Sequence, residues 1–180
     1  LRPQPVSRLR TRASNRSEPL SSNEYAISLP FPLLNKEKAT TVLQTLRDEL
    51  LISKGLRSLN TSHPDYHGVY GGDPWHRDSA YHQGTAWSFL LGGYIDGIMK
   101  VKGEKGKNEA KAVLTEFFPH LDEACVGSVS EIFDANNPFT PRGCMAQAWG
   151  VAEVLRVAVE YNLFDGSKKH TRSKEKASSL

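Results

Sequence analysis

Apolar side chains recur at helical spacing in four segments of this chain. In residues 35–51, NKEKATTVLQTLRDELL, valine and leucine return every three or four positions, and mostly charged or polar side chains fill the positions between them. Residues three and four apart share one face of a helix, so this spacing predicts an amphipathic helix. Thr140 followed by Pro141 resembles a helix start, with an N-cap hydroxyl and a proline in the first turn. Equivalent apolar patterns predict further helices over about 85–101, 108–120 and 141–163.

Strand signals are weaker than helix signals. The stretch YAISLPFPLL, residues 25–34, is apolar, but Pro30 and Pro32 exclude it from the middle of a sheet, because proline cannot donate a ladder hydrogen bond. The prediction is therefore an all-α fold. Residues 55–80 and 127–141 are expected to form two long loops, and connections of that length inside a compact domain are commonly functional.

Composition limits the kind of protein this can be. The chain has 180 residues, of which 38% are hydrophobic and 24% charged, and this predicts one core of ordinary domain size. Its apolar stretches are much shorter than the roughly 20 residues that cross a bilayer, so no membrane partner is expected. Cys125 and Cys144 form neither a disulfide framework nor a paired metal-ligand spacing, which favours a reducing, cytoplasmic compartment.

The net charge of +3 is divided unevenly along the chain. Residues 1–22 are rich in arginine and serine and carry +4, residues 166–180 carry another +4, and residues 23–165 carry −5. The basic character therefore belongs to two tails that are expected to be disordered, the first being a transit segment or foreign to the domain. We expect no nucleic-acid partner, because the basic charge does not belong to the folded segment.

The first long segment gathers unusual side chains. Residues 62–87 hold four histidines together with aspartates, tyrosines, tryptophans and an arginine. The histidine spacing is not that of a zinc site, so no metal site is predicted. Aromatic rings mixed with charged and amide groups suit a sugar, which offers apolar C–H faces as well as hydroxyl groups. The alternative is that these side chains satisfy one another across a buried loop.

The second long segment places a carboxylate, Glu131, between Val129 and Ile132. A partly buried glutamate has a raised pKa unless hydrogen-bond donors compensate, and such a carboxyl group can act as a general acid or base. The alternative is a loop glutamate held by backbone N–H groups or by Arg142. Asp134 is predicted to be a turn former.

Six blocks of the sequence resemble, in order and spacing, the C-terminal glucosidase domain of glycogen debranching enzymes. The resemblance extends over about residues 25–164. The blocks are SLPFPLL (28–34), GLRSL (55–59), YGGD (70–73), RDSAYHQGTAW (77–87), GSVSEIFD (127–134) and PRGCMAQAWGVAEVLR (141–156).

This resemblance implies a fold and an activity. Residues 23–165 would form the C-terminal part of an (α/α)6 toroid, with long active-site loops at one end. The implied reaction is hydrolysis of the α-1,6-linked glucose at a branch point of glycogen or of a branched limit dextrin. The family is related to glucoamylases, which invert the anomeric carbon with two carboxyl groups. No cofactor is implied.

The resemblance also implies roles for individual residues. Glu131 occupies the position of the family's general base. Arg77 and Asp78 would support the glucose subsite, and Gln147 and Trp149 would lie near the same pocket. The residues expected to line the glucose subsite itself are Tyr81, His82, Gln83 and Trp87.

The family's general acid lies upstream of every residue present here. The chain is therefore expected to be a C-terminal fragment, with the missing N-terminal half of the enzyme as its partner. Two alternatives remain open at this point. One is a non-catalytic carbohydrate-binding or interaction module, and the other is a different inverting α-glucosidase that acts on α-1,4 linkages.

Overall fold

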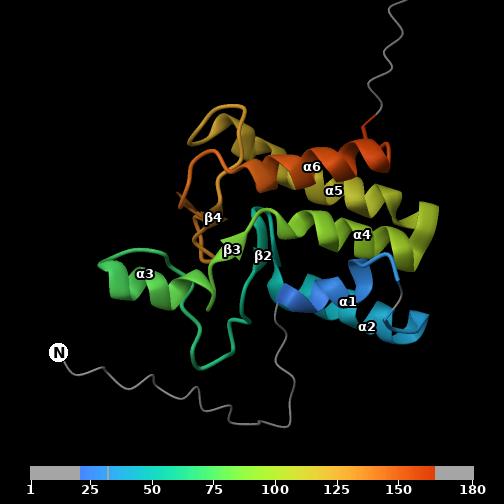
Figure 1. Ribbon diagram of the computed structural model, residues 1–180, viewed down its shortest axis with the longest axis horizontal. Coiled ribbons are helices and arrows are strands. Elements are labelled where there is room, and N and C mark those ends of the chain that lie inside the picture. The colour runs from blue at the N-terminus through green and yellow to red at the C-terminus, as the bar shows by residue number, and fades with distance from the viewer. Residues whose placement is uncertain (1–20, 32, 165–180) are drawn as a thin grey trace, which may run out of the picture.

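A computed structural model of the chain describes residues 21–31 and 33–164. Most of the two predicted basic tails, 1–20 and 166–180, lies outside these residues. Helices dominate the described part (Figure 1), and none of them is long and apolar enough to cross a membrane. The α-helices are α1 (Tyr25–Ser28), α2 (Lys36–Thr45), α3 (Pro74–Tyr81), α4 (Leu90–Lys102), α5 (Lys107–Phe117) and α6 (Ala148–Glu160).

Helix α4 lies at the centre of the helical body. Figure 1 shows it between α1 and α2 on one side and α5 and α6 on the other. The glycines of this helix lie where neighbouring helices come close. A Cβ atom on Gly92 would lie 1.9 Å from the Glu153 carboxylate of α6, and one on Gly97 would lie 2.6 Å from Ile27 of α1. The two neighbouring helices can approach α4 because these positions lack side chains.

The predicted helix over 35–51 is confirmed for most of its length. Asn35 caps it, because its side-chain oxygen accepts a hydrogen bond from the Lys38 backbone N–H at 3.0 Å. The α-helix ends at Thr45, and one π-helical turn follows over Leu46–Leu50. The predicted third helix is α5, which continues into a 3₁₀ turn over Phe118–Asp122.

A five-stranded antiparallel sheet corrects the all-α prediction. Its strands are paired in chain order. Each strand has only two or three residues, too few for an alternation of apolar and polar side chains to be visible in the sequence. The strands are β1 (Leu51–Ile52), β2 (Gly55–Arg57), β3 (Ala86–Trp87), β4 (Ile132–Phe133) and β5 (Pro141–Arg142).

Two helix boundaries were wrong for the same reason. Ala86 and Trp87, placed at the start of the second predicted helix, pair in the sheet instead. Pro141 begins strand β5 and not the last helix, a place where its missing N–H is tolerated because β5 is at the edge of the sheet. The helix begins only at Ala148. Conversely, residues 25–28 of the apolar stretch near the N-terminus form a helical turn.

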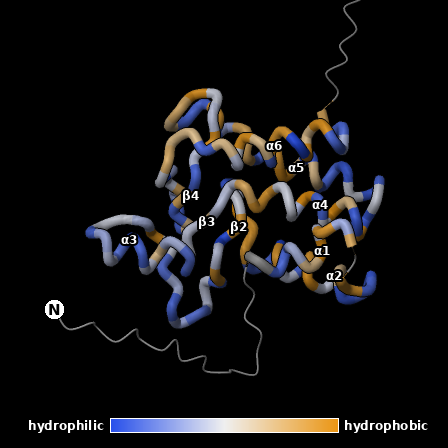
Figure 2. The backbone as a smooth tube through the Cα atoms, viewed as in Figure 1, coloured by the Kyte–Doolittle hydropathy of each residue, from blue (hydrophilic) through white to orange (hydrophobic). Residues whose placement is uncertain are grey.

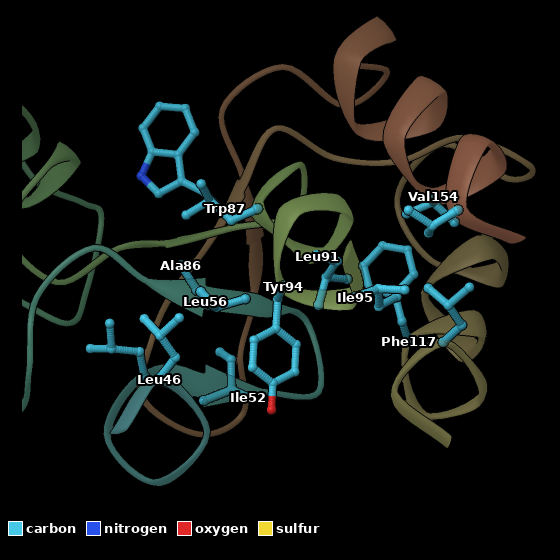
Figure 3. Close-up of a cluster of buried hydrophobic side chains, with 14 of the residues drawn as sticks. Leu46, Ile52, Leu56, Ala86, Trp87, Leu91, Tyr94, Ile95, Phe117 and Val154 are labelled. Atoms are coloured by element: carbon cyan, nitrogen blue, oxygen red, sulfur yellow. The ribbon is translucent and has the colours of Figure 1, made fainter. Parts of the chain in front are cut away.

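One buried core joins the short sheet to helices α1, α2, α4, α5 and α6. Figure 3 shows Leu56 and Ala86 on the strands, and Leu91, Tyr94 and Ile95 on the helix, as parts of one buried cluster. In Figure 2 the apolar segments of α4 and α6 run through the helical body, whereas α3 is mostly polar. The described residues are thus mainly helical with a small antiparallel sheet, and the complete toroid remains a prediction.

Candidate active site

Glu131 directly precedes strand β4 and is held from two directions. Its Oε2 atom accepts a hydrogen bond from the Cys144 backbone N–H at 2.8 Å, and its own backbone N–H donates to the Cys144 carbonyl at 2.8 Å. Its Oε1 atom accepts a hydrogen bond from the hydroxyl group of Tyr81. The side chain is half-buried. The two donors fix the carboxylate in place at the start of strand β4.

Tyr81 is the last residue of α3. This helix begins at a clear signal, because the Asp73 side chain caps it by accepting a hydrogen bond from the His76 backbone N–H at 3.0 Å, and a proline occupies the first turn. Partial burial raises the pKa of the Tyr81 hydroxyl, and its hydrogen bond to Glu131 raises that pKa further. The phenol therefore keeps its proton at neutral pH and acts as a donor to the carboxylate.

Aromatic rings form a cavity next to this pair. Its volume is about 210 Å³, below the roughly 300–1,000 Å³ of pockets for drug-sized ligands, which suits one small ring. The Trp87 ring lies 4.7 Å from that of Tyr81 between centroids and is stacked on that of His82 at 5.4 Å, whereas Trp149 is stacked on Phe89 at 4.5 Å. The lining residues are Tyr25, Ser58, His82, Trp87, Phe89, Leu90 and Trp149.

The remaining predicted site residues do not line this pocket. The side chains of Arg77, Asp78 and Gln83 are exposed, and within residues 33–164 they form no hydrogen bond or ion pair. Gln147 precedes α6, and its backbone N–H donates to the Val129 carbonyl at 2.8 Å. The structure thus brings Glu131 together with Tyr81 by a direct hydrogen bond and places the other aromatic residues beside them.

Sequence reasoning missed the ion pair that supports the loop behind Glu131. Asp134, predicted as a turn former, is buried and accepts hydrogen bonds from Arg142 at 2.9 and 3.1 Å and from the Tyr70 backbone N–H at 2.8 Å. Arg142 therefore pairs with Asp134 and not with Glu131. The alternative interpretation of Glu131 was wrong in naming Arg142, but its other possibility, a backbone N–H group, agrees with the bond from Cys144. The sequence did contain a signal for this pair, because Asp134 and Arg142 carry opposite charges and lie on the two sides of the same turn.

A buried histidine was also missed. His120 is fully buried, and its Nε2 atom accepts a hydrogen bond at 3.0 Å from the backbone N–H of Ser130, the residue before Glu131. Burial lowers the pKa of His120, so the ring stays neutral and keeps an acceptor nitrogen. Its Nδ1 atom lies 3.0 Å from Glu123, which also pairs with Lys54 at 2.9 Å. This network fixes the backbone that carries the candidate carboxylate.

The histidines of the first loop do not converge on one point. His76 bonds Asp73, His63 lies near Asp65, and His82 packs on Trp87. Among residues 21–31 and 33–164, no group of three or more histidine, cysteine, aspartate and glutamate side chains is arranged to hold a metal ion.

The site therefore combines an anchored carboxylate with an aromatic pocket, an arrangement that can bind a sugar ring and accept a proton beside it. A comparison with known protein families adds an independent finding. The family described as amylo-alpha-1,6-glucosidase matches residues 12–156, which include Glu131 and every other predicted site residue. The match begins inside the segment 1–22 that was predicted to be a tail. It covers well over half of the sequence, and the chain belongs to the amylo-alpha-1,6-glucosidase family.

Proposed function

We propose that this chain carries the general-base half of a glucosidase site that hydrolyses the α-1,6-linked branch-point glucose of glycogen or a branched limit dextrin. The observation that supports this most directly is the anchoring of Glu131 between the Tyr81 hydroxyl and the Cys144 N–H, with the Tyr81 ring in contact with Trp87 of the aromatic pocket. A carboxylate that accepts hydrogen bonds from two donors is held in a fixed position, as a general base must be. Membership of the family supports a glucosidase-type activity in general.

In this proposal Glu131 accepts a proton from water while the water oxygen attacks the anomeric carbon. The bond from that carbon to the leaving oxygen breaks at the same time, and a second carboxyl group protonates the leaving oxygen. Attack from the opposite face inverts the configuration, which requires two carboxyl groups roughly 6.5–9.5 Å apart. Asp134 is close along the chain, but its pairing with Arg142 makes it unsuitable as the acid. We propose that the acid comes from the N-terminal half of the enzyme.

The sugar would lie against the aromatic rings. Trp149 is 45% exposed and offers an apolar ring surface to the C–H groups of a pyranose, and the exposed side chains of His82 and Gln83 can bond its hydroxyl groups. The proposed partner is therefore a branched α-glucan in the cytoplasm. Neither a nucleic acid nor a membrane is part of the proposal.

α-Glucosyl fluoride tests the base without the acid. Fluoride leaves the anomeric carbon without being protonated first, so Glu131 alone can assist the attack of water, giving glucose and hydrogen fluoride. We expect fluoride release above the buffer rate from the chain as it stands, and β-glucose as the first product. A Glu131→Gln variant should lose about 10²–10⁴-fold in rate, the usual contribution of a positioned base.

Glu116→Gln, the same chemical change at an exposed position of α5, is the matched control and should keep the rate. Formation of α-glucose would contradict inversion. Equal rates for the chain and its Glu131→Gln variant, together with unchanged sugar binding, would reject the hydrolase and leave a carbohydrate-binding module. Comparing the affinity of the chain for branched dextrins with its affinity for linear maltooligosaccharides would separate an α-1,6 preference from an α-1,4 preference.

A further inference from the structure

Helix α3 carries an exposed tryptophan, Trp75, that is not part of the hydrophobic core. Trp75 is 79% exposed, compared with 45% for Trp149 and 5% for Trp87. Its ring contacts no other ring among the described residues. The start of α3 is stabilised by other groups, because Asp73 accepts hydrogen bonds from the His76 backbone at 3.0 Å and from its ring at 2.8 Å. Neither the cap nor the core depends on Trp75.

The position of Trp75 connects it to the aromatic pocket. Trp75 and Asp78 are three positions apart, so they share one face of α3, and His82 is the C-cap residue that directly follows the helix, seven positions after Trp75. With a rise of 1.5 Å per residue, Trp75 lies roughly 10 Å along the axis from His82. His82 lines the pocket and is stacked on Trp87. Figure 1 shows α3 standing apart from the helical body. The side chains of Trp75, Asp78 and His82 are all exposed.

The chemistry of this row suits a continuing sugar chain. An exposed indole offers a flat apolar face to the C–H groups of a pyranose, and the unpaired Asp78 carboxylate can accept hydrogen bonds from two hydroxyl groups. A single exposed apolar side chain is ordinary on a protein surface. Its alignment with an exposed, unpaired carboxylate and with a ring of the pocket is the observation that points to a ligand.

We propose that Trp75, Asp78 and His82 form an outer row that binds the α-glucan chain beyond the sugar held in the aromatic pocket. This inference rests on the proposed function and extends the same site. The outer row would make affinity depend on chain length, because a monosaccharide or disaccharide in the pocket does not reach Trp75, whereas an oligosaccharide does. Trp75 would then select polymeric substrates over free glucose.

The test is calorimetric titration of the chain with maltose and with maltohexaose. We expect maltohexaose to bind more tightly than maltose, and Trp75→Ala to lower the ratio of the two affinities about three- to tenfold, the order of one stacking contact. Trp75→Phe should restore part of the ratio, because it keeps a flat ring. Phe31→Ala is the matched control, since Phe31 is 81% exposed and follows α1, which Figure 1 shows apart from α3.

Three results would overturn the outer row. They are equal affinities for the two sugars, a Trp75→Ala effect of the same size on both sugars, and an equal effect from Phe31→Ala. Any of these together with Glu131-dependent hydrolysis of α-glucosyl fluoride would reject the outer row alone. Absence of both sugar binding and fluoride release would instead reject the proposed function from which the outer row is derived.

Discussion

Glu24 is a buried carboxyl group whose ionisation should oppose folding. It is 1% exposed, and its Oε2 atom has no hydrogen-bond partner among the described residues. Two other carboxylates act on it, Asp96 on α4 and Glu153 on α6, and both of them bond Arg156. Burial is the main cause that raises the pKa of Glu24 from 4.5 to about 9, and the two neighbouring carboxylates raise it further.

The sign of the effect follows from proton linkage. At neutral pH the folded chain keeps a proton on Glu24, whereas the unfolded chain loses it above pH 4.5. Because the folded pKa is the higher one, the stabilisation is complete below the unfolded pKa and is lost as the pH rises toward 9. Each pH unit in this window costs about 1.4 kcal/mol, so the loss at pH 7.5 is on the order of 4 kcal/mol.

A Glu24→Gln variant has a similar shape and cannot ionise. Its free energy of unfolding should exceed that of the wild type by an amount that grows by about 3 kcal/mol between pH 5.5 and pH 7.5. Urea denaturation followed by circular dichroism at both pH values measures this difference. Glu116→Gln, an exposed change of the same kind, controls for the lost charge and should show no such growth. A Glu24→Gln difference that stays constant with pH, or that grows toward low pH, would refute the argument.

Two further variants test how the site is held. Tyr81→Phe removes the hydroxyl that bonds Glu131, so unfolding in urea should become about 1–3 kcal/mol easier, and fluoride release from α-glucosyl fluoride should slow; an unchanged rate would contradict a positioning role. Asp134→Asn leaves Arg142 without its buried carboxylate partner, so the free energy of unfolding in urea should fall by about 3 kcal/mol. Glu104→Gln breaks the exposed pair of Glu104 with Lys107 and should lower the free energy of unfolding by about 1 kcal/mol or less. Equal losses for Glu104→Gln and Asp134→Asn would contradict the argument that burial makes the Asp134 pair more important.

Most of the helical part could be predicted from the sequence, because long amphipathic segments repeat their pattern often enough to be recognised. Segments 35–51 and 108–120 were placed within a few residues of α2 with its π-helical turn and of α5. The sheet could not be predicted in this way. A strand such as Ala86–Trp87 has one residue per face, and its pairing is set by partners distant in the sequence.

For the candidate site too, the sequence indicated which residue types are present but not which distant residues come into contact. The residue types around Glu131 and in the aromatic loop suggested a sugar site with a carboxylate, and this stays a prediction. The contact between Tyr81 and Glu131 joins residues 50 positions apart, and no local pattern reports such a distance. The resemblance to glucosidases brought them into one site, but it did not indicate which group bonds the carboxylate.

The sheet that the sequence did not reveal is also what assembles the site. Strand β3 pairs with β4 so that Trp87 lies opposite Ile132, and this register brings the pocket tryptophan beside the residue that follows Glu131. On the other side of β3, Gly55 of β2 has a φ of +146°, and a Cβ atom there would lie 2.2 Å from the Trp87 carbonyl oxygen. Only glycine permits this approach. The position of Trp87 relative to Glu131 is therefore fixed by three short strands, and the surrounding helices serve to hold those strands together.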